Sequence, residues 1–315
     1  MRKFSGTREA FAAAMLDMAD ENKNVYFVSA DSLKAMRAVP FAERYPDRYV
    51  EVGIAEQASV DVAAGLASCG LVPFVGTYAG FLTMRACEQM RTFVAYPHLN
   101  VKFVGINAGL IGGEREGVTH QFYEDLGILS SIPGFAIYTP ADAIQTYWAV
   151  RYAYETEGPV YVRAASGREA DVYDIHSTFD PDGLTVLKSY GSDYVIFASG
   201  FIMDRVIAAA DTLHAEGIDV TVADVNILYG KNPYKILDRI KKAKILFTVE
   251  DHNINGGLGS YICHLVCEHD PKPVHRIGLK SFGESGPAAA LADHYGFGSD
   301  NIAMTIKSHI KSKEA

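Results

Sequence analysis

The sequence predicts an α/β protein of two domains, each a mostly parallel sheet flanked by helices. The chain has 315 residues, which is long for one compact core and short for three. Short apolar runs alternate with longer segments of helical period, the order typical of parallel sheets covered by helices on both faces. The alternation lapses between about residues 165 and 190 and then resumes. We therefore expect domains at residues 1–175 and 190–315.

The first half of the chain contains the elements of one α/β unit. Apolar runs typical of buried strands lie at residues 24–30, 71–75, 101–106 and 160–163. Segments of helical period lie between them at residues 7–19, 56–68, 81–94 and 141–155. Because strands and helices alternate along the chain, we expect these strands to be parallel.

The second half repeats the pattern after a stretch rich in turn-forming residues. This stretch includes Ser-Gly-Arg-Glu-Ala-Asp and Phe-Asp-Pro-Asp-Gly, which favour a linker over a helix or strand. Beyond it, we expect strands at residues 194–198, 219–223 and 244–249, and helices near residues 201–215 and after Gly259. These elements predict a second α/β domain.

Composition argues against several classes of protein. The net charge is −9, and no dense run of Lys and Arg is present, which argues against a nucleic-acid partner. Apolar runs end well before the ~18 residues needed to cross a bilayer, so we expect no membrane partner. The N-terminus lacks the apolar core of a signal peptide, and four cysteines are too few for a disulfide framework. We expect a cytoplasmic protein.

One candidate site residue lies where a predicted strand turns into a helix. The segment Glu-Val-Gly-Ile-Ala-Glu-Gln at residues 51–57 places Glu56 at this junction. Ligands of parallel sheets gather at the carboxyl ends of the strands. A carboxyl group there is suited to proton exchange with a heterocycle nitrogen. A glutamate in the first helical turn also serves as a partner of the helix dipole, so this segment alone leaves both interpretations open.

Two further segments follow predicted strands in the same way. Residues 76–81 read Gly-Thr-Tyr-Ala-Gly-Phe, in which glycines and aromatic rings suit a flat ligand, although core aromatics fit the pattern too. Residues 107–121 form a long, glycine-dense loop that contains His120. Such loops are often functional, and a histidine can move protons near neutral pH. An idle, solvent-exposed histidine remains the alternative.

Together these motifs resemble the transketolase family. Gly-Ile-Ala-Glu-Gln, Thr-Tyr-x-x-Phe-Leu and Gly-Glu-x-x-Gly-x-Thr-His-Gln are similar to its pyrimidine-binding domain. Thr-Val-Glu-Asp-His-Asn-Ile-Asn-Gly-Gly-Leu-Gly-Ser at residues 248–260 resembles its C-terminal domain. Met-Arg-Ala-Cys-Glu-Gln-Met-Arg at residues 84–91 is similar to the C-terminal subunit of split transketolases. The resemblance implies a thiamine-diphosphate pyrimidine-binding domain followed by a transketolase C-terminal-like domain.

The resemblance also implies roles for individual residues. Glu56 would hydrogen-bond a pyrimidine nitrogen of thiamine diphosphate as a catalytic and cofactor-binding residue. Phe81 would stack on the pyrimidine, with Tyr78 nearby. Met84 occupies a position where many transketolases carry a second aromatic residue, so this wall of the cofactor site would be looser. His120 would contact the substrate hydroxyls as a second catalytic residue.

Three residues match positions that hold the sugar phosphate in the family. These are Arg8, Ser29 and Arg163. Two arginines suit a terminal phosphate because their planar guanidinium groups match its oxygens. For each arginine alone, a surface salt bridge fits the sequence equally well.

The chain departs from the family at two places that would touch the sugar. Asn107 stands where a histidine is usual, and the loop at residues 113–117 is one residue longer and includes Glu116. Both changes alter the hydrogen bonds offered to a substrate. We therefore expect a ketose phosphate other than xylulose 5-phosphate, such as the branched apulose 4-phosphate.

A motif that the family uses elsewhere is missing from this sequence. Transketolases bind the diphosphate through Mg²⁺ with a Gly-Asp-Gly…Asn stretch, and this chain contains no Gly-Asp dipeptide. Mg²⁺ prefers carboxylate and phosphate oxygens, and this chain does not offer them in the family's arrangement. We therefore expect no metal ligands in this chain. A separately encoded N-terminal transketolase subunit would supply the diphosphate and Mg²⁺ half of the site. Two copies of each subunit would form a heterotetramer.

Other functions remain open at this point. A subunit related to 1-deoxyxylulose-5-phosphate synthase shares Ala-Glu-Gln and Tyr-x-x-Phe-Leu, and would decarboxylate pyruvate. The β chain of a 2-oxoacid dehydrogenase fits less well because its loop motif differs. A catalytically silent interaction subunit would explain the departures at Asn107 and residues 113–117. The joint presence of Glu56, Phe81 and His120 argues against it.

Overall fold

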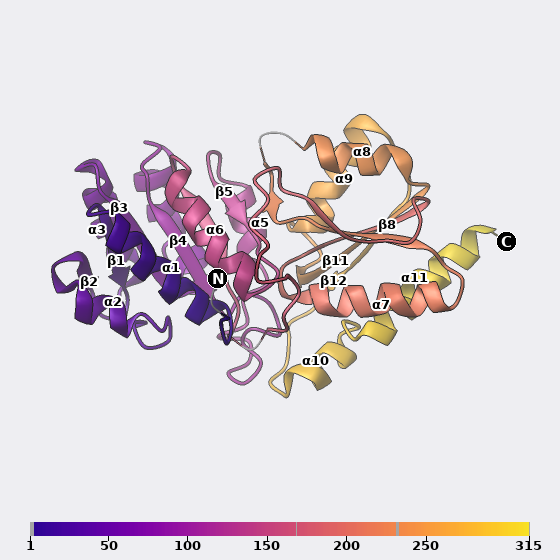
Figure 1. Ribbon diagram of the computed structural model, residues 1–315, viewed down its shortest axis with the longest axis horizontal. Coiled ribbons are helices and arrows are strands. Elements are labelled where there is room, and N and C mark those ends of the chain that lie inside the picture. Colours follow the sequence, from indigo (N-terminus) through magenta and orange to yellow (C-terminus); the bar gives the residue numbers. More distant parts are fainter. Residues whose placement is uncertain (1–2, 168, 231–232, 315) are drawn as a thin grey trace.

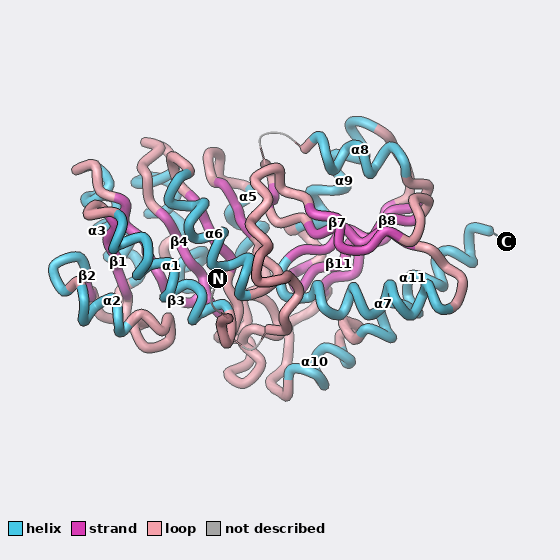
Figure 2. Tube along the Cα trace, in the orientation of Figure 1, coloured by secondary structure: helices cyan, strands magenta, loops and turns pink. Residues whose placement is uncertain are grey.

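Two α/β domains lie side by side in the computed structural model, which describes residues 3–167, 169–230 and 233–314 (Figure 1). The first domain is drawn in indigo to magenta and the second in orange to yellow. Each domain contains a sheet flanked by helices, which confirms the predicted fold class. Loops gather at the seam between the domains (Figure 2). Within the described ranges, no helix is long and apolar enough to cross a membrane.

The first sheet has seven strands in the order β10-β5-β6-β4-β3-β1-β2. Its strands are β1 (Val25–Ser29), β2 (Tyr49–Glu51), β3 (Val72–Tyr78), β4 (Lys102–Ile106), β5 (Ala136–Tyr138), β6 (Val160–Arg163) and β10 (Ile227–Leu228). Every pair of neighbours is parallel except β10 with β5. The carboxyl ends of β1, β3, β4 and β6 therefore lie at one edge of the sheet.

Helices cover both faces of this sheet because its strand residues are apolar on both sides. Phe27 and Phe74 belong to the core shared with α1 and α6, whereas the next residues, Val28 and Val75, belong to the core shared with α3. This alternation is the period of two expected of a strand. The helices are α1 (Thr7–Glu21), α2 (Val39–Arg44), η1 (Pro46–Arg48), α3 (Glu56–Ser68), α5 (Asp125–Ser130) and α6 (Ala143–Glu155).

The segment predicted as one helix at residues 81–94 is helical but is not a continuous α-helix. Two stretches of π-helix, η2 (Phe81–Arg85) and η3 (Met90–Ala95), flank the short α4 (Cys87–Gln89). A π turn is wider than an α turn and often occurs at functional sites. Side chains in this segment therefore do not follow the 3.6-residue period on which the prediction relied.

The second sheet has five strands in the order β12-β11-β8-β9-β7, of which β7 is the antiparallel edge strand. Its strands are β7 (Thr185–Ser189), β8 (Tyr194–Ser199), β9 (Val220–Asp224), β11 (Ile245–Asn253) and β12 (Val274–Leu279). Its helices are η4 (Gly200–Ile202), α7 (Met203–Ala215), α8 (Tyr234–Lys242), α9 (Leu258–His269), α10 (Ala288–His294) and α11 (Ser299–Glu314).

The two domains are interleaved more than the sequence predicts. Strand β7 joins the second sheet although it precedes residue 190, where we expected that domain to start. Strand β10 returns from the second half of the chain to pair with β5 of the first sheet. Within the linker, Phe179 packs against Tyr138 and Tyr152, with ring centroids 5.2 and 5.6 Å apart. The linker is therefore packed against the first domain.

Candidate active site

Most of the candidate residues lie at the carboxyl edge of the first sheet. Ser29 and Tyr78 are the last residues of β1 and β3, and Asn107 directly follows β4. These three strands are hydrogen-bonded neighbours in parallel register. Ligands of parallel sheets bind at such an edge. The topology thus brings together segments that are up to 78 residues apart in the sequence.

Glu56 is a buried carboxylate at the start of α3. Only 2% of the residue is exposed, and its Oε1 accepts a hydrogen bond of 2.7 Å from Arg85 Nη1. The Arg85 side chain is about half exposed, so this is an ion pair between a buried anion and a cation at the surface. Among the described residues, no donor reaches the other carboxylate oxygen of Glu56. That oxygen can accept a hydrogen bond from a ligand.

Aromatic rings form a compact cluster beside this carboxylate. The ring of His120 lies edge-on to Tyr78 and Phe81, with centroids 5.2 and 5.3 Å away. The Arg85 guanidinium carbon lies 4.3 Å from the centroid of Phe81. A Cβ at Gly80 would lie 1.9 Å from Phe122, so only glycine allows these segments to approach so closely. The structure therefore brings Glu56, Tyr78, Phe81 and His120 together, as the sequence predicts.

A second group contains Arg8 and Asn107. Arg8 Nη2 donates a hydrogen bond to Asn107 Oδ1, and its Nε and Nη1 each lie 3.4 Å from a backbone carbonyl oxygen, of Ala165 and Ala35 respectively. Asn107 has a φ of 55°, a left-handed conformation that asparagine tolerates better than most residues. Burial lowers the pKa of Arg8, although an arginine remains charged near neutral pH. This pair offers a positive charge and an amide to a ligand.

Glu116 and Met84 lie at the surface near these groups. Glu116 is exposed in the loop at residues 113–117, and its charge acts on Arg8. Met84 is 45% exposed in η2, one residue before Arg85. Ser29 is fully buried, and its Oγ accepts a hydrogen bond of 3.0 Å from the backbone nitrogen of Ser32. Its hydroxyl thus serves the turn that follows β1.

Arg163, the last residue of β6, is bonded to groups of both domains. Its side chain is 3% exposed, and its Nε donates to Asp125 Oδ2 at 2.9 Å. Its Nη2 donates to the backbone oxygen of Asp251 in the second domain, also at 2.9 Å. Arg163 therefore lies in a buried ion-pair network that reaches the domain interface, and its role as a phosphate ligand stays a prediction.

Sequence reasoning missed two features of this region. Arg85 lies within the motif at residues 84–91 but received no role, because the π turn that places it over Phe81 leaves no clear period in the sequence. The buried polar network around Arg163, which includes Asp125, Asp251 and His252, was missed as well. Burial lowers the pKa of His252 to about 4, so its imidazole is neutral at pH 7.

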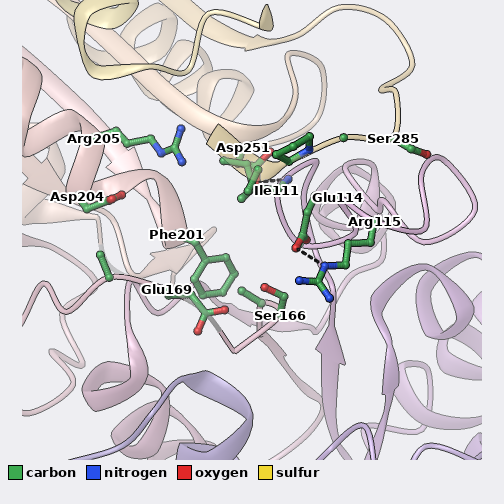
Figure 3. A pocket seen from close by; sticks show the side chains of 16 residues that line it. Ile111, Glu114, Arg115, Ser166, Glu169, Phe201, Asp204, Arg205, Asp251 and Ser285 are labelled. Atoms are coloured by element: carbon green, nitrogen blue, oxygen red, sulfur yellow. Dashed lines mark hydrogen bonds and ion pairs between the residues drawn. The ribbon is translucent and has the colours of Figure 1, made fainter. Parts of the chain in front are cut away.

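A cavity of about 680 Å³ opens where the two domains meet (Figure 3). Glu114 and Arg115 reach into it from the glycine-dense loop, whereas Phe201, Asp204 and Arg205 enter from the second domain. Ser166 and Glu169 of the linker close another side. Ala165, whose carbonyl oxygen contacts Arg8, also lines the cavity, so the cavity adjoins the group of Arg8 and Asn107. Charges of both signs line it.

Two family models match this chain in succession. The model of the transketolase pyrimidine binding domain matches residues 5–167, and that of the transketolase C-terminal domain matches residues 183–302. The first range contains all the candidate residues named above. The second begins two residues before β7.

Individual proteins are similar along nearly the whole chain. An apulose-4-phosphate transketolase subunit of Actinobacillus succinogenes is 34% identical over 278 residues, which cover 87% of this chain and 89% of that protein. A 6-deoxy-6-sulfo-D-fructose transketolase subunit of a Clostridium species is 31% identical over 296 residues, with coverage of 94% and 91%. A split-gene transketolase solved as an inactive beta4 tetramer superimposes with a TM-score of 0.87 at 34% identity, covering 97% of this chain and 98% of that chain.

Proposed function

The chain belongs to the transketolase family through both of its domains, and on this premise we propose that it is the pyrimidine-binding subunit of a two-chain transketolase. It would transfer a two-carbon ketol unit from a ketose phosphate to an aldose. The observation that carries this proposal is the cluster of Glu56, Phe81 and His120, which joins a buried carboxylate, an aromatic surface and an imidazole at one sheet edge.

The residues of this cluster fit the pyrimidine end of thiamine diphosphate. The oxygen of Glu56 that Arg85 leaves unbonded can accept a hydrogen bond from a ring nitrogen, and Phe81 offers a flat apolar surface. Thiamine diphosphate would supply the nucleophilic carbon and hold the electron pair while one carbon–carbon bond breaks and another forms. Glu56 would hold a proton at the ring nitrogen. Arg85 would keep the charge of this buried carboxylate paired.

Substrate groups would be held by the adjoining residues. His120 has one edge against the rings of Tyr78 and Phe81, and a ring nitrogen could exchange a proton or a hydrogen bond with a sugar hydroxyl. Arg8 would bind the terminal phosphate, assisted by the amide of Asn107. Glu116 would lie at the rim of the substrate site. Because Asn107 already accepts a hydrogen bond from Arg8, the pair presents a pattern that differs from that of a histidine, which supports an unusual ketose phosphate such as apulose 4-phosphate.

A partner subunit would complete the site. Among the described residues, no group of three or more His, Cys, Asp or Glu side chains could hold a metal ion. Large apolar side chains are exposed on and beside α3 and the π-helical segment: Ile54 (75%), Met84 (45%), Phe93 (48%) and Tyr96 (87%). Exposed apolar patches mark protein interfaces, and α3 contacts both π-helical stretches, so these residues lie on or next to neighbouring elements. We infer that an N-terminal transketolase subunit covers this face, supplies the Mg²⁺ and diphosphate ligands, and assembles as two plus two.

Binding of thiamine diphosphate and Mg²⁺, measured by calorimetry, tests this proposal. The measurement is made on this chain alone and on the complex co-expressed with the chain encoded next to it. We expect tight binding only in the complex. Tight binding by the lone chain would refute the division of the site between subunits. Binding in neither sample would favour the silent interaction subunit.

Replacement of Glu56 tests its catalytic role. In the complex, Glu56→Gln should lower kcat by about 100-fold or more, the lower end of general acid–base effects. Glu268→Gln, on an exposed position of α9, is the matched control and should leave kcat unchanged. Unchanged activity of Glu56→Gln would remove the catalytic assignment. Release of carbon dioxide from pyruvate would instead support the alternative related to 1-deoxyxylulose-5-phosphate synthase.

A further inference from the structure

The loop that carries His120 is held in place mainly by the second domain. Residues 109–121 contain no helix or strand, and only isolated bridges to Phe122 link the start of the loop to regular pairing. Such a loop needs contacts from outside to keep one conformation. Its contacts to the second domain occur at its beginning, in its middle and at its end.

The beginning of the loop is attached to β11. The backbone nitrogens of Leu110 and Ile111 donate hydrogen bonds of 2.8 and 3.2 Å to the two carboxylate oxygens of Asp251. Gly109 has a φ of 84°, and a Cβ there would lie 2.2 Å from Asp251 Oδ2. Only glycine therefore allows Asp251 to approach so closely.

The middle and the end of the loop are attached to residues 283–286, which follow β12 and which we call the brace. The backbone nitrogen of Gly286 donates to the oxygen of Glu114 at 2.9 Å. Gln121 Nε2 donates to the backbone oxygen of Glu284 at 2.8 Å. Gln121 is 2% exposed and is the direct neighbour of His120, so this bond acts next to the imidazole.

A further bond ties the brace to Tyr123, two residues after the loop. The backbone nitrogen of Gly283 donates to the hydroxyl of Tyr123 at 3.0 Å, and Tyr123 is 2% exposed. A Cβ at Gly283 would lie 2.3 Å from Leu110 Cδ1 and 2.5 Å from Gln121 Oε1, both of them on buried side chains. The brace and the loop are therefore packed without space between them.

These attachments fix the position of His120. Within the loop, the nitrogens of His120 and Gln121 both bond to the oxygen of Gly117, at 2.8 and 3.0 Å. A Cβ at Gly113 would lie 2.0 Å from the backbone oxygen of His120. Because the loop is folded so tightly on itself, a displacement at Glu114 or Gln121 would move the imidazole relative to Tyr78 and Phe81.

We propose that the brace is a positioning element for catalysis, through which the second domain holds His120 against the aromatic cluster. The catalytic part of this inference rests on the proposed function. The physical part, that the brace fixes the loop, does not depend on it. Glu56 and Phe81 lie on α3 and η2, outside the loop, so the brace should affect turnover and not the binding of the cofactor.

Two variants of the full chain test the inference. Tyr123→Phe removes the hydroxyl that accepts from Gly283 and keeps the buried ring, so the fold should persist. Gly283→Ala forces the brace and the loop apart. Lys280→Ala is the matched control, because this exposed side chain follows β12 and lies outside the brace.

Amide hydrogen exchange of the lone chain is the first measurement. Peptides that cover residues 109–121 should exchange about tenfold faster in both variants than in the wild type and in Lys280→Ala, because local opening becomes easier. Unchanged exchange in both variants would overturn the inference. This measurement needs no activity, so it decides whether the brace holds the loop even if the proposed function fails.

Kinetics of the reconstituted complex is the second measurement. Both variants should lower kcat by about tenfold, while the apparent Kd for thiamine diphosphate stays within about twofold of the wild type. Faster exchange with unchanged kcat would overturn the positioning role. Loss of cofactor affinity in parallel with kcat would show a general structural defect and would also overturn it. A wild-type complex without transketolase activity would contradict the proposed function, and the exchange result would then stand alone.

Discussion

Replacing Asp125 with alanine tests how much its buried ion pair with Arg163 stabilises the fold beside the domain interface. The side chains of Asp125 and Arg163 are 0% and 3% exposed, and Asp125 Oδ2 accepts hydrogen bonds from Arg163 Nε at 2.9 Å and from Tyr161 Oη at 2.7 Å. Removal of the carboxylate would leave the guanidinium buried, hydrogen-bonded to the backbone oxygen of Asp251 and attracted by the carboxylates of Asp251 and Glu250. An uncompensated buried charge is strongly unfavourable because water cannot reach it.

The expected loss of stability follows from these contacts. Breaking a buried pair from one side costs about 3–5 kcal/mol, and the attraction of Asp251 and Glu250 to Arg163 puts the expected cost at the lower end of this range. Asp125→Ala should therefore lower the free energy of unfolding by that amount in urea titrations followed by circular dichroism. Asp125→Asn keeps an oxygen that can accept from Tyr161 and Arg163, and should cost about half as much.

An exposed pair provides the control for this experiment. Asp238 and Lys242 form an i,i+4 ion pair on α8 with both side chains more than half exposed, so Asp238→Ala should change the urea midpoint little. A loss below about 1 kcal/mol for Asp125→Ala would contradict the structural role that we assign to the pair.

Two further predictions concern specificity and pH. Asn107→His would replace the acceptor of the Arg8 hydrogen bond. In assays of the complex, kcat/KM should therefore rise for xylulose 5-phosphate relative to apulose 4-phosphate. An unchanged ratio of the two kcat/KM values would show that Asn107 does not select the sugar. His252 has a pKa of about 4 in the folded chain against 6.5 when unperturbed, because burial disfavours its charged form. Its contribution to stability is therefore fully present above pH 6.5 and is lost as pH falls towards 4, by up to about 3 kcal/mol. Burial raises the pKa of Glu250 to about 7, which changes stability with pH in the opposite direction. The urea midpoint of the wild type should therefore be compared, as a function of pH, with that of His252→Gln, which lacks the histidine contribution. Parallel curves for the two proteins would refute the contribution of His252.

The sequence by itself determined what depends on neighbouring residues. Apolar runs such as residues 160–163 predicted β6 with its observed bounds, and the period of residues 56–68 did the same for α3. Burial on both faces of a parallel sheet leaves this local pattern in the chain. The motifs around Glu56, Phe81 and His120 also lie in single stretches, each at the carboxyl end of a strand, so their meeting at one edge follows from the order of strands and helices.

Only the tertiary structure decided the contacts between distant segments. Arg163 reads equally well as a phosphate ligand or an ion-pair partner, and its bond to Asp125 appears only when β6 and α5 are packed together. The π turns that place Arg85 over Phe81 leave no clear period in the sequence. The bond between Gln121 and Glu284 joins residues 163 positions apart. Such pairs are selected by packing free energy over the whole chain, whereas patterns and motifs report only the local part of it.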